Sequence, residues 1–244
     1  MRKYKLVVAY DGTNYSGWQR QPAGVVTVQR VVEIAAGQIV NHPVTVAGSS
    51  RTDAGVHATG QVAEMEADTH LEPHRLRRAI NSRLPEDVVI REMEYSPEGF
   101  NLRAAVRKRY RYLIWSHMDR PIFYRHYVYH YWHKTNLQRM QAACQHFEGT
   151  FDFSAFKGRQ DERENSVRTI FYCGIHQRGP LFIFSVEGSG FLYHMVRTMV
   201  GTVLEVGNGQ REPESIPEII ASKSRANAGQ CSPPQGLSLQ WIRF

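Results

Sequence analysis

YKLVVAYD, residues 4–11, alternates between the two faces of a strand and opens the pattern that decides the fold. Apolar residues at helical spacing follow over 28–40, and a second strand pattern covers 43–48. This half ends with a strand, an Arg-rich surface helix and a strand, at 61–68, 72–82 and 87–95. The order β-α-β-β-α-β predicts a ferredoxin-like (RRM-like) α+β unit, with an antiparallel sheet and its helices on one face.

The same order restarts after Pro97, Gly99 and Phe100. We expect a strand, a helix, two strands, a long helix ending at Gly207, a short helix and a strand, at 107–115, 137–147, 168–177, 181–187, 191–206, 214–222 and 237–244. Strand-like material at 124–133 and a polar loop at 157–167 are inserted between them. The halves share element order and no sequence identity, so a mixed α/β arrangement stays open. We predict an N-terminal α+β unit at 1–104 and a basic C-terminal one at 105–244.

The formal net charge of +7 is confined to one half of the chain. Basic and acidic residues balance over 1–104, so the whole excess lies in 105–244. Of the 30 basic residues, 24 are arginine, whose planar guanidinium pairs with phosphate through two hydrogen bonds and stacks on bases. A polyanion is the natural partner, although many basic proteins bind no nucleic acid.

The cysteines, at 144, 173 and 231, are odd in number and lack a C-x-x-C spacing. This argues against a disulfide framework and against a thiolate zinc site, and it predicts reduced thiols in a cytoplasmic protein. No apolar run approaches the ~18 residues of a membrane span, and the first residues lead straight into a strand. We therefore expect a soluble protein with no membrane partner and no targeting segment.

The segment SSRTDAGVHA, residues 49–58, contains little that could fill a core. Its ordinary interpretation is a turn in which Asp53 caps a helix. The alternative is a functional site, in which Asp53 is exposed or lies in a cleft and Arg51 meets an anion. Gly55 would then take the positive φ that lets a second chain approach closely.

The strand RKRYRY, residues 107–112, interleaves cations with aromatic rings. Strand spacing places Tyr110 and Tyr112 on one face and Arg109 and Arg111 on the other. A ring on a sheet surface is a stacking platform for an unstacked base, worth about 1–3 kcal/mol. In the alternative interpretation, the tyrosines face the core and the arginines are solvated.

The helix expected over 191–206 is apolar around most of its circumference, and Arg197 interrupts it. Tyr193 and Gly201 share its face, and a mid-helix glycine costs about 1 kcal/mol relative to alanine, so something is expected to pack closely there. A buried guanidinium requires a carboxylate, for which Asp53 is the candidate. Otherwise Arg197 extends to solvent from the helix edge.

Histidines 126 and 130 have the spacing of a metal pair on a helix. Their aromatic neighbours favour a strand, which sends His133 to the opposite face, so we expect no metal site. His57 and His194 are expected to be hydrogen-bonding neighbours of a site rather than acid–base catalysts.

Several segments appear together in one order along nearly the whole chain: YDGTNYSGWQRQ (10–21), TVQ (27–29), RTDAGVHA (51–58), RYRY (109–112), HMVR (194–197) and GL (236–237). In this combination the chain resembles the TruA family, tRNA pseudouridine synthase I. The resemblance implies the pseudouridine synthase fold and a cofactor-free, metal-free homodimer. It also implies isomerisation of uridine to pseudouridine at positions thirty-eight to forty, in the anticodon stem-loop of tRNA.

The resemblance also implies roles for individual residues. On the family's pattern Asp53 is the catalytic carboxylate and Arg197 is the arginine paired with it. Tyr110 is the base-stacking tyrosine, Arg51 is a contact in base flipping, and Leu237 is an apolar wall of the pocket. Arg109, beside the tyrosine, is a further candidate for binding substrate. Two departures stand out: Ser50 replaces a glycine common in relatives, and Asn101-Leu102-Arg103 replaces His-Ala-Arg, which puts the role of the family's histidine in doubt here.

The chemistry agrees with this assignment. Pseudouridine formation breaks the C1′–N1 bond, turns the uracil and rejoins it through C5, so a carboxylate nucleophile in a closed pocket suffices. Arg197 would keep Asp53 ionised, and the tyrosine would hold the detached base. Attack at C1′ and attack at C6 both remain open. Unstacking the target costs a few kcal/mol, which phosphate contacts of the basic half could offset.

Two other function classes fit the sequence less well. A non-catalytic RNA-binding protein would not place a carboxylate near RNA, because it repels phosphates. A metal-dependent nuclease would need a cluster of carboxylates that residues 49–58 lack. The presence of Asp53 between Arg51 and Gly55 therefore favours the isomerase.

Overall fold

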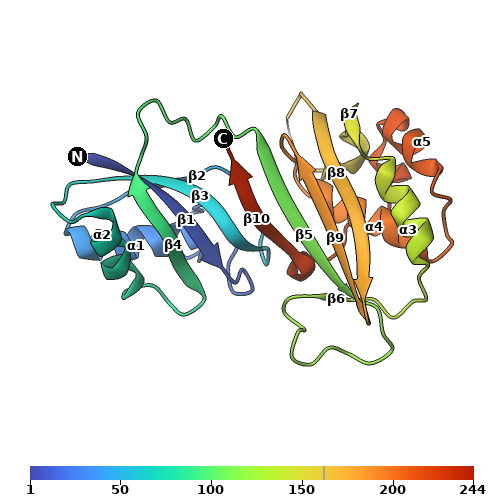
Figure 1. The fold of residues 1–244 in the computed structure, drawn as a ribbon, viewed down its shortest axis with the longest axis horizontal. Helices are drawn as coiled ribbons and strands as arrows, with labels where there is room; N and C mark the ends of the chain where they lie inside the picture. The colour runs from blue at the N-terminus through green and yellow to red at the C-terminus, as the bar shows by residue number, and fades with distance from the viewer. Residues whose placement is uncertain (162) are drawn as a thin grey trace. The chain divides into compact units, whose positions relative to one another are not determined.

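The computed structural model describes residues 1–161 and 163–244, and the chain divides into two compact units (Figure 1). The first unit consists of Met1–Ala105 together with Ser238–Phe244. The second consists of Val106–Leu237. The last strand of the sequence therefore clusters with the N-terminal part of the chain.

The first unit has the element order β-α-β-β-α-β, followed much later by the last strand. Its elements are β1 (Arg2–Tyr10), α1 (Val28–Val40), β2 (Val46–Gly48), β3 (His57–Ala67), α2 (Pro73–Asn81), β4 (Val88–Tyr95) and β10 (Leu237–Arg243). Strand β1 lies between β3 and β4 and is antiparallel to both. The other edge of β3 is shared, because β2 pairs antiparallel at Met65 and β10 pairs parallel at His57. The order β4-β1-β3-β2 is the antiparallel arrangement of a ferredoxin-like unit.

The core of the first unit lies on one face of this sheet. Alternate residues of β1 are fully or nearly fully buried, namely Tyr4, Leu6, Val8 and Tyr10. The two helices supply the opposing layer, since α2 packs against β4 and α1 packs against α2 and β2. Their apolar stripes include Val28 and Val32 on α1 and Leu76 and Ile80 on α2.

The second unit repeats the scheme with additions. Its elements are β5 (Arg107–Trp115), β6 (Tyr129–His130), α3 (Leu137–Gln145), β7 (Gly149–Asp152), β8 (Val167–Arg178), β9 (Leu181–Gly188), α4 (Met195–Gly207) and α5 (Ser215–Ser222), with short 3₁₀ turns η1 (Ser154–Phe156), η2 (Arg225–Asn227) and η3 (Pro234–Gly236). The strands run β5-β9-β8-β7, each antiparallel to its neighbour. Helix α3 packs against β8 and α4 (Figure 1). The predicted fold class, two α+β units with antiparallel sheets, is confirmed.

Three expectations about elements were wrong. The strand predicted over 124–133 is reduced to β6, because local hydrogen bonds such as Tyr127 N–H to the Tyr124 carbonyl make 121–127 a series of turns. Helix α4 begins at Met195 rather than Phe191, since His194 takes a left-handed conformation with φ of 60°. Strand β7 was not expected. The predicted polar loop at 157–167 includes residue 162, which lies outside the described residues.

The cysteines are free thiols, as expected: Cys144 and Cys173 are buried and Cys231 is half-buried. In the described part of the chain no helix combines the length and the apolar character needed to cross a bilayer.

Candidate functional site

In the first unit, the loop that carries Asp53 is held by the segment that follows β1. Trp18 donates its backbone N–H to the Thr52 carbonyl at 3.2 Å, and Gly55 donates to the Tyr15 carbonyl at the same distance. The Tyr10 hydroxyl and the Thr52 hydroxyl lie 2.7 Å apart within hydrogen-bond reach. Backbone and side-chain contacts thus fix the residues on both sides of Asp53.

Two glycines of the segment that follows β1 let its backbone approach the backbone of the Asp53 loop closely. A Cβ at Gly12 would lie 2.1 Å from the Val56 carbonyl oxygen, and one at Gly17 would lie 2.5 Å from the Thr52 carbonyl oxygen. Gly17 also has a φ of +88°, which disfavours any L side chain. The glycines of YDGTNYSGWQRQ therefore allow this segment to pack on the Asp53 loop.

His57 supports the same loop from the start of β3. Its Nδ1 accepts the Gly12 backbone N–H at 3.0 Å and lies 3.1 Å from an Asp11 carboxylate oxygen. His57 is buried, and its role as a hydrogen-bonding neighbour of a site rather than an acid–base catalyst stays a prediction.

Asp53 lies in a turn that leads into a strand. The Asp53 carbonyl accepts the Val56 N–H at 3.1 Å, and Gly55 takes a φ of +75° between them. Because β3 follows, the interpretation of Asp53 as a helix cap is wrong. The Asp53 side chain is half-buried and Arg51 is exposed.

In the second unit, Tyr110 lies on β5, opposite Val186 of β9, and only 6 % of its surface is exposed. The centres of the Tyr110 and Phe191 rings lie 5.1 Å apart, and the ring planes make an angle of 83°, which is an edge-to-face contact. Tyr112, two residues along the same face, is fully buried and donates its hydroxyl to the Pro233 carbonyl at 2.7 Å. Burial raises the pKa of Tyr112 well above its usual value, so this residue belongs to the core.

Arg109 lies on the opposite face of β5 from Tyr110, as the strand spacing predicts. Glu187 of β9 pairs with Arg109 at 3.3 Å and with Arg107 at 2.6 Å. The Arg109 guanidinium also lies 6.0 Å from the centre of the Tyr172 ring. Part of its charge is therefore offset within the sheet, and a role for Arg109 in binding substrate stays a prediction.

Arg197 lies in the first turns of α4 and is held by the chain that runs along the helix. Its Nε donates to the Ser232 carbonyl at 2.7 Å, and Ser232 N–H donates back to the Arg197 carbonyl at 3.1 Å. The close packing predicted at Gly201 is confirmed, because a Cβ there would lie 1.7 Å from the Gln230 carbonyl oxygen. Because Gly201 has no side chain, the segment 230–232 can pack against α4, where Ser232 holds Arg197 through hydrogen bonds.

Gly201→Ala should destabilise the protein by about 2–3 kcal/mol, because the added methyl must displace a packed backbone and outweighs the ~1 kcal/mol gain in helix propensity. Urea unfolding measures the change. Gly37→Ala in α1 is the comparison, since its Cβ would lie 3.1 Å from the His42 carbonyl oxygen and requires a smaller shift. A Gly201→Ala protein as stable as the wild type would contradict the packing described here.

Leu237 is nearly fully buried at the start of β10 and ends the second unit. The preceding Gly236 packs on the Tyr112 ring, where a Cβ would approach within 2.5 Å. The η3 turn therefore fixes Leu237 relative to β5.

No sequence pattern indicated the contacts that organise the approach to α4. The Asp161 carboxylate accepts the Tyr193 N–H at 2.7 Å, and Arg163 donates to the Phe191 carbonyl at 3.1 Å. The hydrogen bond from Arg163 holds the pKa of Asp161 well below its usual range. The available signal was the change from apolar to polar residues at Lys157, which predicted a loop but not its contacts.

The first unit therefore carries Arg51 and Asp53, and the second carries Tyr110, Arg109, Arg197 and Leu237. The ion pair between Asp53 and Arg197 stays a prediction. Within residues 1–161 and 163–244, no three His, Cys, Asp or Glu side chains are grouped so that they could hold a metal ion.

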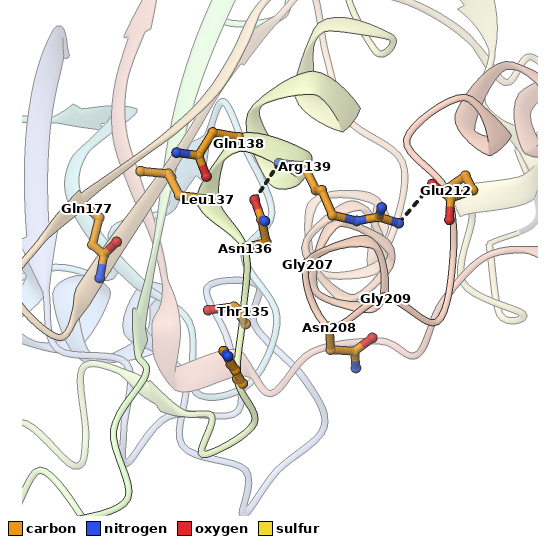
Figure 2. A pocket seen from close by; sticks show the side chains of 11 residues that line it. Thr135, Asn136, Leu137, Gln138, Arg139, Gln177, Gly207, Asn208, Gly209 and Glu212 are labelled. Atoms are coloured by element: carbon orange, nitrogen blue, oxygen red, sulfur yellow. Dashed lines mark hydrogen bonds and ion pairs between the residues drawn. The ribbon is translucent and has the colours of Figure 1, made fainter.

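A shallow cavity of about 590 Å³ lies elsewhere in the second unit, between the start of α3 and the end of α4 (Figure 2). Its lining is mostly polar, and Asn136 caps α3 there while Arg139 pairs with Glu212 at 2.9 Å. No predicted site residue lines it.

Comparison with known proteins gives full-length similarity. A family model described as tRNA pseudouridine synthase matches residues 6–103 and 143–244. The chain is 42% identical over 245 residues to tRNA pseudouridine synthase A of Acetivibrio thermocellus, covering 100% of both chains. It is 41% identical over 240 residues to the protein of the same name from Geotalea uraniireducens, covering 98% of each. A solved structure described as a Cbf5-Nop10-Gar1 complex matches at 15% identity and a TM-score of 0.39, over 82% of this chain and 45% of that one.

Proposed function

The chain belongs to the tRNA pseudouridine synthase family, and from this premise we propose that it forms pseudouridine at positions thirty-eight to forty, in the anticodon stem-loop of tRNA. The class of reaction, isomerisation of uridine in tRNA, is the family's. We propose the position of the target uridine in tRNA and the roles of the individual residues in the reaction. Asp53 is the nucleophile, Tyr110 stacks on the base and accepts a proton, and Arg197 pairs with Asp53.

The reaction is an isomerisation and balances without a redox partner. The C1′–N1 bond breaks while the Asp53 carboxylate holds the nucleotide in a covalent intermediate. The uracil turns, C5 bonds to C1′, and the bond between the nucleotide and the Asp53 carboxylate breaks, which restores the free carboxylate. The proton lost from C5 is matched by the proton gained at N1, so no cofactor is consumed.

One observation carries the assignment of Asp53. It is a half-buried acid on a turn that glycines at positions 12 and 17 bring against a second segment of the same unit. An acid in such a setting, next to the exposed Arg51, suits chemistry on an anionic chain better than simple binding, because a carboxylate repels phosphates. A non-catalytic RNA-binding protein gains nothing from it.

The other assigned residues have supporting roles. The Nε of Arg197 is engaged by the Ser232 carbonyl, so the terminal nitrogens of the guanidinium would form the pair with Asp53. Such a pair would orient the carboxylate through charge-assisted hydrogen bonds. Leu237 forms an apolar wall for the base, and Arg51 assists its exit from the stack.

The proposal is tested with tRNA transcripts that carry uridine at each of the three positions in turn. Chemical mapping should find pseudouridine at those positions and none in transcripts with cytidine there. Efficient modification outside the anticodon stem-loop would refute the proposed target. The resemblance also leads us to propose a cytoplasmic homodimer, which light scattering of the purified chain would report as twice the mass of one chain.

Affinity for tRNA should fall steeply with salt, by at least about 10²-fold between roughly 50 and 200 mM, because phosphate contacts release counterions. The excess charge lies in the second unit, so Arg159→Glu should weaken binding more than Arg83→Glu, an equally exposed arginine of the first unit. Filter retention measures both. A flat salt response, or equal effects of the two reversals, would contradict the prediction.

A further inference from the structure

The segment between β9 and α4 passes directly beside Tyr110. Its Phe191 ring meets the Tyr110 ring edge-on at 5.1 Å. Gly158 and Asp161 hold this segment in place, because Gly158 N–H donates to the Tyr193 carbonyl at 2.8 Å and Asp161 accepts the Tyr193 N–H. The surroundings of the Tyr110 ring are therefore set by two loops and not by β5 alone.

Hydrogen bonds hold the Arg163 side chain beside the segment between β9 and α4. Its Nε donates to an Asp161 oxygen at 2.8 Å, and Nη1 donates to the Phe191 carbonyl at 3.1 Å. The guanidinium therefore lies against the backbone of the residue whose ring contacts Tyr110.

Two more cations converge on the same segment. Lys108 precedes Tyr110 by two residues on the same face of β5, and it pairs in register with Gly188, where the segment begins. Arg168, near the start of β8, lies over the segment itself, since a Cβ at Gly190 would be 3.6 Å from its Nε. Its guanidinium donates to the Asn165 and Val167 carbonyls, which fixes its direction.

The three cations raise the local positive potential. Burial, and then the charge of Arg163, lower the pKa of Lys108 to about 8. The same two causes lower the pKa of Arg168, with Asp161 acting in the opposite direction. Asp161 pairs with Arg163 and offsets part of this charge, whereas the Glu187 carboxylate pairs with Arg107 and Arg109 on the other face of the sheet.

An anion placed beside Lys108 and Arg168 would offset the repulsion that each receives from the charge of Arg163. Arginine and lysine held at fixed positions match a phosphate group, whose oxygens accept several charge-assisted hydrogen bonds. The ring beside the cluster is the one assigned to stack on the target base.

We propose that Lys108, Arg163 and Arg168 form a binding site for one phosphodiester of the RNA substrate, adjacent to the nucleotide whose base stacks on Tyr110. This inference rests on the proposed function for the identity of the RNA. The site anchors the sugar–phosphate backbone next to the target, so that the energy of phosphate binding offsets the cost of unstacking the base.

The test uses a synthetic anticodon stem-loop RNA and a series in which one phosphate at a time near the target is replaced by an uncharged methylphosphonate. Binding to the wild-type protein should weaken about tenfold at one linkage beside the target uridine. Lys108→Met and Arg168→Gln should each weaken binding of the unmodified RNA about tenfold and lower the salt slope by about one. In these variants the same methylphosphonate should cost less than about twofold, because the contact is already lost.

The matched control is Arg178→Gln, at the far end of β8. Ten residues of strand separate it from Arg168, which is about 33 Å. Arg178→Gln removes the same charge from the same strand. The loss of binding caused by the methylphosphonate beside the target uridine should stay as large as in the wild type. Lys108→Arg and Arg168→Lys keep the charge and should retain at least half of the salt slope lost by the neutral variants.

The proposal is overturned if no single linkage beside the target matters to the wild type, a result that does not depend on how the variants fold. It is also overturned if folded neutral variants, checked by thermal unfolding, keep the full penalty at that linkage. Binding is read independently of turnover. Failure of the wild type to form pseudouridine in the unmodified stem-loop would therefore refute the proposed function, while the phosphate contact is still scored by binding.

Discussion

Asp53→Asn should abolish pseudouridine formation while leaving the affinity for tRNA equal to that of the wild type or slightly higher. The amide is nearly isosteric, so the turn held by Gly55 and the Val56 N–H is preserved. It is a far weaker nucleophile than a carboxylate, and it removes a negative charge that repels phosphates. Chemical mapping of transcripts measures turnover, and filter retention measures binding.

A matched control is Asp119→Asn, which removes an equal charge from an exposed carboxylate of the second unit. It should leave turnover unchanged and shows what loss of a negative charge alone does to affinity. Residual activity of Asp53→Asn within about tenfold of the wild type corresponds to a barrier change of only ~1.4 kcal/mol, too small for the loss of a nucleophile. Such a result would remove Asp53 from that role.

Tyr110→Phe should lower turnover by at least about 10²-fold with little change in tRNA affinity. Stacking requires only the ring, which the edge of Phe191 continues to orient. The missing hydroxyl is the proposed acceptor of the C5 proton, and loss of a general base costs a factor of this size. Single-turnover assays at saturating enzyme separate this chemical defect from binding.

Tyr112→Phe provides the comparison for Tyr110→Phe. It also removes a phenolic hydroxyl from β5, but one that donates to the Pro233 carbonyl inside the core. It should cost about 1 kcal/mol of stability and leave turnover of the folded protein intact. Tyr110→Leu should lose stacking and therefore weaken binding as well. Wild-type turnover by Tyr110→Phe would reduce Tyr110 to a stacking platform.

Elements with a strong local period could be predicted at their boundaries. Helix α1 and strand β5 occupy the residues expected, because each has a repeating apolar face, which includes Val28 and Val32 on α1 and Tyr110, Tyr112 and Ile114 on β5. The start of α4 could not be predicted in this way. Phe191 and Leu192 continue the helical period, but the Tyr193 backbone is held outside the helix, because its N–H donates to the Asp161 carboxylate and its carbonyl accepts from Gly158 N–H.

The site could be predicted as residue types and only partly as geometry. Gly201 indicated a close approach, and the structure supplies the Gln230 carbonyl that fills it. The pairing of Arg109 with Glu187 depends on the register of β5 against β9, which no local pattern encodes. The grouping of Lys108 with Arg163 and Arg168 depends on contacts across more than fifty residues of chain. The pattern and spacing of residues indicate only contacts between residues that are close together in the sequence.

The place of β10 beside β3 affects how the protein is made. During synthesis the first unit emerges from the ribosome before β10, the strand that pairs with β3 at His57 and Ala58 on the edge away from β1, because this pairing begins at Ser238. That sheet edge must wait for about 180 further residues, tens of seconds at the slower rates of translation. An open strand edge is a template for wrong pairing, so nascent chains and fragments that stop before residue 238 are expected to be prone to aggregation. A tag or fusion at the C-terminus would likewise act on the completion of the N-terminal unit.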